Sequence, residues 1–402
     1  MVLAARKGGR VVSGIAILAG TYVLSQFFRS FLAVLAPVLV ADLPVGEADL
    51  ATAAGVWFIA FALMQFPVGW ALDRYGPRRT ASVVLLAAVV GAVLFSVAEG
   101  PAAIIAAMAL IGVGCSAVLM AAFYILARRY PPRRFAMFAS WFVAIGLSGG
   151  VLGSAPLAFA TDALGWRAVM AGLAGVTMLA VLAVALWVRD PPPAIAPTGT
   201  GSLLTLLKMR QLWPLMAIAF VAYAPAANMR GLWAGPFLAD IHGFDIEAIG
   251  QATFVMAIAL ILGTIAYGPL DVLFNTRKWV PFVGVSVTAL CMAGLAATVG
   301  GSATIAIVLL TAVTFFGAGY ALIMAHARSM VPAHLIGRGV TLMNFFSIGG
   351  AGVVQFLSGG VFAAATSHTT PANAYAILFG FYAVLLAAGL TAYSFSRDSR
   401  TR

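Results

Sequence analysis

Charged residues are scarce in this chain of 402 residues. Aspartate, glutamate, lysine and arginine together make up only 9% of it, whereas apolar residues make up 63% and the mean hydropathy is +1.04. A soluble domain cannot hide so much apolar surface, because its exterior must be largely polar. The composition therefore predicts a membrane protein in which lipid is the solvent for most side chains.

Cysteine and the motifs of catalysis are also few or missing. The two cysteines, Cys115 and Cys291, lie in apolar runs without a partner motif, so we expect packed thiols and no disulfide framework. No phosphate-binding glycine loop, metal-ligand cluster or nucleophile motif is present, which argues against an enzyme, a cofactor or a bound metal. The net charge of +11 does not indicate a nucleic-acid partner, because the basic residues punctuate apolar runs and form no basic domain.

What the chain does contain is twelve apolar runs, each long enough to cross a bilayer as a helix. A helix needs about 20 residues to cross ~30 Å of hydrocarbon, and the alternating pattern of barrel strands is not visible. The predicted spans are 11–40, 49–72, 80–98, 102–127, 135–160, 166–188, 213–239, 248–270, 279–299, 303–325, 340–366 and 373–395.

The basic residues lie almost entirely on one side of these spans. With the N-terminus inside, 20 of the 23 fall in cytoplasmic segments, Arg29 and Arg230 fall within spans, and only Arg167 lies outside. Arginine outnumbers lysine 20 to 3, a bias that hints at a GC-rich bacterial gene. We therefore predict a multi-pass protein in the lipid bilayer of a bacterial inner membrane, with both termini cytoplasmic.

A segment rich in proline and glycine divides the spans into two sets of six. It predicts an N-terminal six-helix bundle at 1–190, a cytoplasmic linker at 191–211 and a C-terminal six-helix bundle at 212–402. Tyr22 and Arg29 in the first run recur as Tyr223 and Arg230 in the seventh. Such duplication is typical of secondary transporters, whose site lies between the repeats near the midplane. The predicted fold class is an all-α membrane protein with twelve transmembrane helices in two pseudo-symmetric bundles.

The two arginines inside spans are the strongest candidates for a binding site. A charge at membrane depth is costly and marks function by default. At ~1.5 Å per residue, both stand ~5 Å outward of the centres of their spans. Positions seven apart share a helix face, so Tyr22, Gln26 and Arg29 form one polar stripe, and Tyr223 and Arg230 form a second. Both stripes should line a central cavity.

None of the 12 acidic residues lies near the middle of a predicted span. A structural ion pair with Arg29 or Arg230 would need an internal carboxylate, whereas a bound anion, held bidentately by guanidinium groups, would supply the missing charge. The alternative is that each arginine reaches the interface or bonds to backbone carbonyls and serves packing. We favour anion binding because the two arginines are matched.

The loop between the second and third spans carries the most specific motif. Residues 69–79 match G-x-x-x-D-R-x-G-x-R-R in full. This loop, the twelve spans and the central linker resemble the major facilitator superfamily over the whole chain. The resemblance implies a conformational latch in which Asp73 faces a helix N-terminus of the other half and the arginines pair with acidic groups at the cytoplasmic surface. Its residues would be Gly69, Asp73, Arg74, Gly76, Arg78 and Arg79. The alternative is that these arginines merely follow the positive-inside rule.

Other candidates rest on polarity or aromatic character alone. His326, near the inner end of the tenth span, is either a proton site or a solvated residue at a loop end. The rest could face a substrate or pack between helices: Tyr124, Trp141, Phe142, Asn344, Phe345 and Gln355.

These features predict a monomeric secondary transporter that moves a small anionic solute by alternating access, through anion exchange or with protons by symport. Arginines in the first and seventh spans resemble the arrangement in organophosphate/phosphate antiporters. From this resemblance we take only the argument that such arginines attract an anion. One alternative is a proton-coupled efflux pump for amphipathic drugs, which would usually need a membrane-embedded carboxylate. Another is a transport-dead sensor or scaffold, which would have little need of the latch motif.

Overall fold

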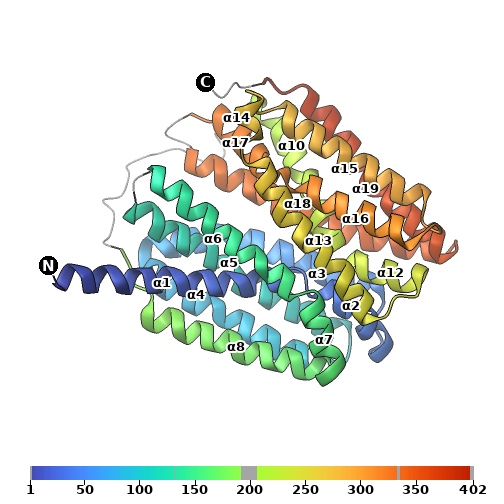
Figure 1. The fold of residues 1–402 in the computed structure, drawn as a ribbon, viewed down its shortest axis with the longest axis horizontal. Coiled ribbons are helices and arrows are strands. Elements are labelled where there is room, and N and C mark those ends of the chain that lie inside the picture. The colour runs from blue at the N-terminus through green and yellow to red at the C-terminus, as the bar shows by residue number, and fades with distance from the viewer. Residues whose placement is uncertain (1, 131, 192–205, 333–335, 399–402) are drawn as a thin grey trace.

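The chain folds into helices that run mostly along one direction (Figure 1). The computed structural model describes residues 2–130, 132–191, 206–332 and 336–398, except for the side chains of 2–13, 132–137, 140, 272, 321, 336–338 and 340. No strand occurs among the described residues. The helical elements of the N-terminal half are α1 (Val2–Phe27), α2 (Leu32–Asp42), α3 (Glu47–Leu63), α4 (Gln65–Ser96), α5 (Pro101–Arg129), α6 (Pro132–Leu152), α7 (Ala155–Leu164) and α8 (Trp166–Trp187). Those of the C-terminal half are η1 (Arg210–Leu212), α10 (Trp213–Ala222), α11 (Ala224–Asn228), η2 (Met229–Trp233), α12 (Ala234–His242), α13 (Ile246–Tyr267), α14 (Leu270–Leu273), α15 (Trp279–Ala297), α16 (Ala303–Phe316), η3 (Gly317–Gly319), α17 (Tyr320–Met330), α18 (Ile336–Thr366) and α19 (Pro371–Ser394).

These elements make twelve membrane spans. Ten stretches of the described chain are long and apolar enough to cross a membrane, and the bent pair α1 and α2 makes an eleventh. The longest stretch, Glu47–Ser96, is interrupted at Gly76, whose φ of 81° is not helical, and therefore forms spans 2 and 3. The sequence prediction of twelve transmembrane helices is confirmed.

The same pairs of spans pack together in each half. Span 1 contacts spans 5 and 6, span 2 contacts span 4, and span 3 contacts spans 4 and 6. In the second half, span 7 contacts spans 11 and 12, span 8 contacts span 10, and span 9 contacts spans 10 and 12. This repeated pattern is that of two pseudo-symmetric six-helix bundles. Most of the predicted linker lies outside the described residues, so the bounds of the two halves stay a prediction.

Several spans are broken near their middle, where the sequence had suggested continuous helices. Span 1 bends by 46° between α1 and α2. Span 7 is interrupted at Tyr223, next to Pro225 in the first turn of α11, and then passes through the π-helical turn η2. Proline lacks the N–H that would continue the helix, and Gly317 and Gly319 weaken span 10 at η3. Irregular backbone at membrane depth is tolerated only inside protein or along a polar cavity, so these breaks mark the centre of the molecule.

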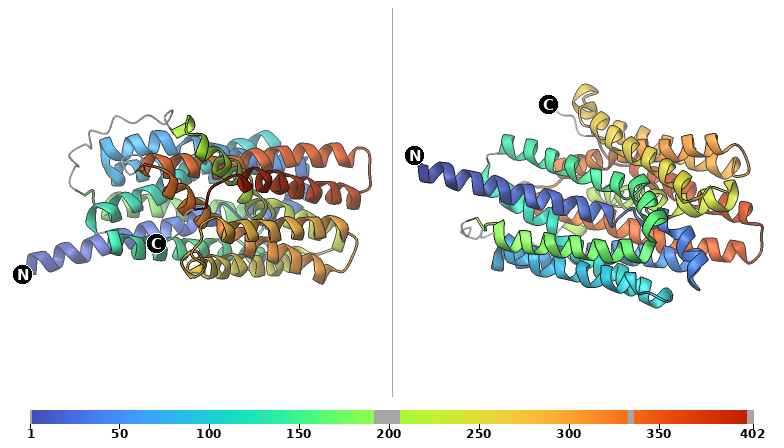
Figure 2. Two further views of the ribbon diagram at one scale, coloured as in Figure 1. Left: turned by 90° about the horizontal axis from the view of Figure 1, so that it is seen from above. Right: turned by 60° about the horizontal axis from the view of Figure 1, so that its bottom comes forward.

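The two halves meet mainly on one side of the membrane. Both termini lie toward the same end of the bundle, which we call the terminal side; the opposite end is the distal side (Figures 1 and 2). The distal pieces α2, α7 and α12 contact spans of the other half, whereas α1, α5, α10 and α17 pack mainly within their own half. Small residues allow the close approach: a Cβ added at Gly235 would lie 1.7 Å from the carbonyl oxygen of Ala33, and one at Gly55 would lie 3.0 Å from that of Gly352. The structure is therefore closed on the distal side.

Candidate functional site

Arg29 lies in the break of span 1 and reaches across to the other half. Its Nη1 donates a hydrogen bond of 3.1 Å to the hydroxyl oxygen of Tyr223 in span 7. The rings of Trp57 and Phe61 lie 5.1 and 5.2 Å from its guanidinium carbon, and that of Phe58 lies 5.8 Å away. Aromatic faces attract a cation through their quadrupole, so this box holds the guanidinium in place without neutralising its charge.

Arg230 approaches the same hydroxyl from the second half. It lies in η2, and its residue is only 4% exposed. Its charge interacts with that of Arg29 and with the hydroxyl of Tyr223. Gly150 of α6 makes room for it, because a Cβ there would lie 2.6 Å from Nη1 of Arg230. The glycine-rich stretch of span 5 thus admits the guanidinium group.

The polar stripe predicted on span 1 is present. Nε2 of Gln26 donates to the hydroxyl of Tyr22 at 2.6 Å, and both residues are buried. The ring of Tyr22 stacks on Phe142 at 5.4 Å between centroids and leaves no space for a side chain at Gly146. Tyr22 interacts electrostatically with Arg29, Tyr223 and Arg230, which places it in the same cluster.

Tyr320 extends the cluster toward span 11 and was not anticipated from the sequence. Its ring packs on that of Tyr223 at 5.5 Å, and its hydroxyl donates to Oδ1 of Asn344. Asn344 is therefore linked to Arg29 through two tyrosines. The available signal was the position of Tyr320 directly after Gly317-Ala-Gly319, the helix break of span 10.

The cluster is rich in positive charge and lacks negative charge. All 12 acidic residues are described, and none of them is buried. Nε of Arg29 and Nε of Arg230 have no hydrogen-bond partner among the described residues. Two desolvated guanidinium groups that share one neutral hydroxyl are electrostatically unfavourable on their own, so the arrangement favours an anion between them.

Two predicted candidates lie apart from the arginines. Trp141 is 59% exposed and packs edge-on against Phe138, and it is the neighbouring Phe142 that contacts Tyr22. Tyr124 accepts a 2.8 Å hydrogen bond from Arg128 near the terminal end of α5. Gln355 is fully buried in α18, and its side-chain amide has no partner among the described residues.

The predicted latch residues form a compact turn on the terminal side. Gly76 adopts a φ of 81°, and a Cβ on it would lie 2.6 Å from Cγ of Asp190. Oδ1 of Asp190 accepts a 2.7 Å hydrogen bond from the backbone N–H of Arg78. Only glycine fits position 76, because its backbone is left-handed and the carboxylate fills the adjacent space.

Among the described residues, the side chains of the latch contact their own half. Asp73 interacts with Tyr124 of its own half, Gly69 faces Met120 of α5, and Arg74 lies 6.0 Å from the ring of Tyr75. Arg78 and Arg79 are exposed, and the only salt bridge within the described part of the chain is elsewhere. The described residues show no cross-half contact of the latch, so the role implied by the family resemblance stays a prediction.

His326 is buried. The alternative that it is a solvated residue at a loop end is therefore wrong. Its Nδ1 lies 2.7 Å from the hydroxyl oxygen of Tyr393, and its Nε2 lies 2.9 Å from the carbonyl oxygen of Arg397. A carbonyl only accepts, so Nε2 carries the proton and Nδ1 accepts from Tyr393. Both nitrogens tie α17 to the end of α19, on the terminal side.

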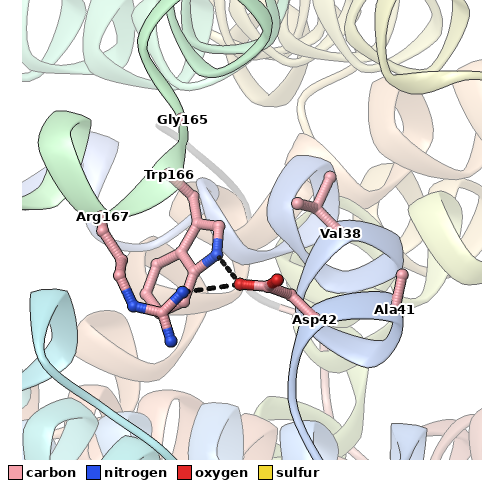
Figure 3. Close-up of a pocket in the computed structure, with 6 residues that line it drawn as sticks. All are labelled: Val38, Ala41, Asp42, Gly165, Trp166 and Arg167. Carbon is pink, nitrogen blue, oxygen red and sulfur yellow. Dashed lines mark hydrogen bonds and ion pairs between the residues drawn. The ribbon is translucent and has the colours of Figure 1, made fainter.

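A surface pocket of about 460 Å³ lies on the distal side (Figure 3). Arg167, the one basic residue predicted outside, contacts Asp42 at 2.6 Å, and Nε1 of Trp166 donates to the same carboxylate oxygen at 2.9 Å (Figure 3). These polar groups are already paired with each other and join spans 1 and 6 of one half. We therefore interpret the pocket as part of a structural contact between two spans and not as a binding site.

Comparisons with known proteins agree with this architecture. The family model for the Major Facilitator Superfamily matches residues 18–355. The chain is 24% identical over 286 residues to "Uncharacterized transporter YybO" of Bacillus subtilis, covering 66% of each protein, just under two thirds. It is 22% identical over 309 residues to the "Hexuronate transporter" of Bacillus subtilis, covering 70% of this chain and 72% of that one. It is also 24% identical over 159 residues to a "Quinolone resistance transporter" of Acinetobacter baumannii, which covers 37% of this chain and 36% of the relative.

Solved structures share the fold at low sequence identity. A bacterial homolog of the human lysosomal transporter Spinster, in an inward-facing and occupied conformation, matches with a TM-score of 0.75 and 20% identity over 94% of this chain and 95% of that one. A D-xylose-proton symporter matches with a TM-score of 0.76 and 13% identity over 96% and 98%. The family match over most of the chain, twelve spans in two matched bundles and the loop motif together identify this chain as a non-enzymatic transporter that belongs to the major facilitator superfamily.

Proposed function

We propose that the protein moves a small anionic solute across the membrane by alternating access, with Arg29 and Arg230 as the anion-binding groups. The observation that carries this proposal is their convergence on one hydroxyl, that of Tyr223, without a buried carboxylate. A planar guanidinium group binds carboxylate or phosphate through two parallel hydrogen bonds. Two such groups, one from each half, would hold an anion between the bundles.

The energetic argument rests on what happens when the site is empty. A charged side chain at membrane depth costs about 2.5–3.5 kcal/mol on the lowest scale, and two like charges add repulsion. The aromatic box around Arg29 offsets part of this cost, at about 2 kcal/mol for a desolvated cation–π contact. A bound anion would neutralise the remainder, so that the ligand stabilises the protein.

Two relatives bear on the choice of solute. A hexuronate carries a carboxylate, and the relative named for its transport supports an anionic substrate here. The relative named for quinolone resistance favours the second candidate, a proton-coupled efflux pump for amphipathic compounds. The absence of buried acids among the described residues weighs against that candidate, because a proton-coupled pump for cationic compounds would use one.

The proposed cycle uses the geometry of both sides. The distal contacts at Ala33 and Gly235 would open to admit or release the solute while the latch closes the terminal side. In the orientation favoured by the positive-inside rule, the terminal side is cytoplasmic and the membrane is the bacterial inner membrane. Exchange of anions and symport with protons both remain compatible with this cycle, and the protein would act as a monomer.

Transport by purified protein in liposomes tests the proposal. We expect saturable uptake of at least one member of a panel of radiolabelled anions, such as D-glucuronate, malate, phosphate and sulfate. Arg29→Gln and Arg230→Gln should each reduce this uptake at least 100-fold, because one fixed charge is lost at a desolvated site. Arg167→Gln is the matched control, since it removes an arginine from the distal surface.

The outcome that contradicts the proposal is equally specific. Normal uptake by both single variants would show that the arginines do not bind the solute. Extrusion of a cationic dye in the absence of any saturable anion uptake would favour the efflux pump.

A further inference from the structure

The amide of Gln355 is buried in α18, which packs against the span that carries Arg230. Two hydrogen bonds between span 7 and α18 bracket it: Asn228 donates to the carbonyl of Ala351 at 3.2 Å, and Trp233 donates to Ser358 at 2.9 Å. Arg230 lies between Asn228 and Trp233 in the chain, as Gln355 lies between Ala351 and Ser358. Gln355 and Arg230 therefore lie in the same stretch of membrane depth, between these two hydrogen bonds.

Gln355 is also close to the boundary between the halves. On α18, the residues that face span 2 are Gly352 and Phe356, which pack on Gly55. In a helix with 100° per residue, position 355 lies between this face and the face of Ala351 and Ser358. The amide thus occupies the junction of spans 2, 7 and 11.

Three buried polar groups in this region have unused hydrogen-bonding capacity. They are both amide atoms of Gln355, Nε1 of Trp57 and Oδ1 of Asn228, none of which has a partner among the described residues. These residues are at most 1% exposed, and the ring of Trp57 stands 5.1 Å from the guanidinium carbon of Arg29. Leaving such a group unpaired costs about 1–3 kcal/mol, so a set of them beside a charged site indicates a polar ligand.

The chemistry of the set restricts that ligand. Nε2 of Gln355 and Nε1 of Trp57 donate, whereas Oε1 of Gln355 and Oδ1 of Asn228 accept. Gln355 presents one acceptor oxygen whichever way its amide is turned, since both of its amide atoms are unpaired among the described residues. The orientation of Asn228 is fixed, because its Nδ2 donates to the carbonyl of Ala351 and leaves Oδ1 as the free acceptor. Sulfate offers acceptors only and cannot satisfy these oxygens, whereas an alcohol group donates and accepts at once.

We propose that Gln355, together with Trp57 and Asn228, recognises hydroxyl groups of the solute, and that the substrate class is a hydroxylated organic acid. The acid group would bind Arg29 and Arg230, and the hydroxyl groups would bind the three neutral side chains. This inference rests on the proposed function and adds a second contact region to it. Trp57 belongs to span 2 and Gln355 to span 11, so hydroxyl recognition would draw on both halves.

Binding of matched anion pairs to the purified full-length protein tests the inference. Each pair consists of a hydroxylated acid and a counterpart of similar size without the hydroxyl groups: D-glucuronate with cyclohexanecarboxylate, D-gluconate with hexanoate, and malate with succinate. We expect the wild-type protein to bind the hydroxylated member of at least one pair about 10-fold more tightly or better, the ratio that one neutral hydrogen bond in a buried site provides.

Gln355→Leu should reduce that preference about 10-fold, mainly by weakening the hydroxylated ligand. Trp57→Phe keeps an aromatic ring over Arg29 and removes the N–H together with part of the indole, so it provides a second test if Gln355→Leu fails to fold. Gln251→Leu is the matched control, because Gln251 is exposed and bonds to Glu247 on the distal side of α13.

Equal affinity within every pair would overturn the inference, as would a preference that survives both Gln355→Leu and Trp57→Phe. Arg29→Gln separates this failure from that of the proposed function. If Arg29→Gln abolishes binding of both members of a pair and the preference survives both Gln355→Leu and Trp57→Phe, the anion site stands and hydroxyl recognition falls. If neither Arg29→Gln nor Arg230→Gln changes either affinity, the proposed function itself fails.

Discussion

Replacing Gly235 by alanine should prevent the two halves from closing on the distal side. The new Cβ would lie 1.7 Å from the carbonyl oxygen of Ala33, whereas carbon and oxygen in such contacts are normally ~3.3 Å apart. The helices must therefore separate by roughly 1.6 Å, because a backbone carbonyl cannot turn away as a side chain would. Overpacking of this kind costs about 1–3 kcal/mol, and it acts only on the closed state.

That cost translates into a shift between conformations. A destabilisation of about 1–3 kcal/mol changes the ratio of closed to open molecules by about 5–150-fold. We expect uptake to slow by at least 5-fold in Gly235→Ala, while the solute still reaches the arginines from the distal side. Gly175→Ala in α8 is the matched control, since no part of another described element lies within 4 Å of a Cβ added there. Both changes raise helix propensity by the same ~1 kcal/mol, so their difference reports the contact.

Spin-label distances measure the shift directly. Cysteines introduced for Glu99 and His368 place labels on exposed distal loops of opposite halves, and the native Cys115 and Cys291 are buried. We expect the distance distribution of Gly235→Ala to move to longer values, with no change in the control. An unchanged distribution together with unchanged uptake would refute the view that the Ala33 contact closes the distal side.

Three further predictions concern other parts of the molecule. Tyr223→Phe removes the hydroxyl shared by both arginines, and we expect KM for the transported anion to rise about 10-fold while the protein remains folded; an unchanged KM would remove Tyr223 from the site. Gly76→Ala places a side chain in left-handed backbone against Asp190, and we expect at least 1–2 kcal/mol of destabilisation from the backbone alone, visible as a lower Tm in detergent than for the wild type. Burial raises the pKa of the Asp398 carboxyl, but hydrogen bonds from Thr276 and two backbone N–H groups outweigh it and the pKa is lowered. The stability that Asp398 contributes is therefore full above its unfolded pKa of about 3.9 and is lost as pH falls through the folded pKa, so that the Tm of Asp398→Asn should fall below that of the wild type at pH 7 and approach it below pH 4.

The arginine pair shows how far the sequence could be taken. The duplication indicated that Arg29 and Arg230 belong to one site. The sequence also indicated that none of the acidic residues lies at the centre of a span. The sequence did not indicate that Arg29 sits in a bend, that Arg230 lies in a π-helical turn, or that both meet at Tyr223. Helix breaks depend on the balance between local propensity and packing, which a single sequence does not display.

The other residues around the arginines were predicted less well. Tyr320 and the aromatic box of Trp57 and Phe61 lie among many similar residues in apolar runs, and nothing local distinguishes them. Trp141 and Phe142 were both candidates, yet only Phe142 stacks on Tyr22, because the two side chains are one 100° step apart around the helix. Asp190 fixes the turn at Gly76 by accepting a hydrogen bond from the backbone N–H of Arg78, although Asp190 and Arg78 are 112 positions apart in the sequence.

The sequence by itself determined that the protein lies in a membrane, crosses it twelve times and carries two charges that lipid cannot satisfy. These are properties of composition and of runs about 20 residues long, and the free energy of transfer into hydrocarbon acts on each run separately. Only the tertiary structure decided that Arg29, Arg230 and Tyr223 meet, that Asp73 lies against Tyr124 and that the amide of Gln355 is buried without a partner among the described residues. Such contacts arise where helices from distant parts of the chain pack face to face, and the packing of small residues such as Gly235 and Gly55 sets which faces meet.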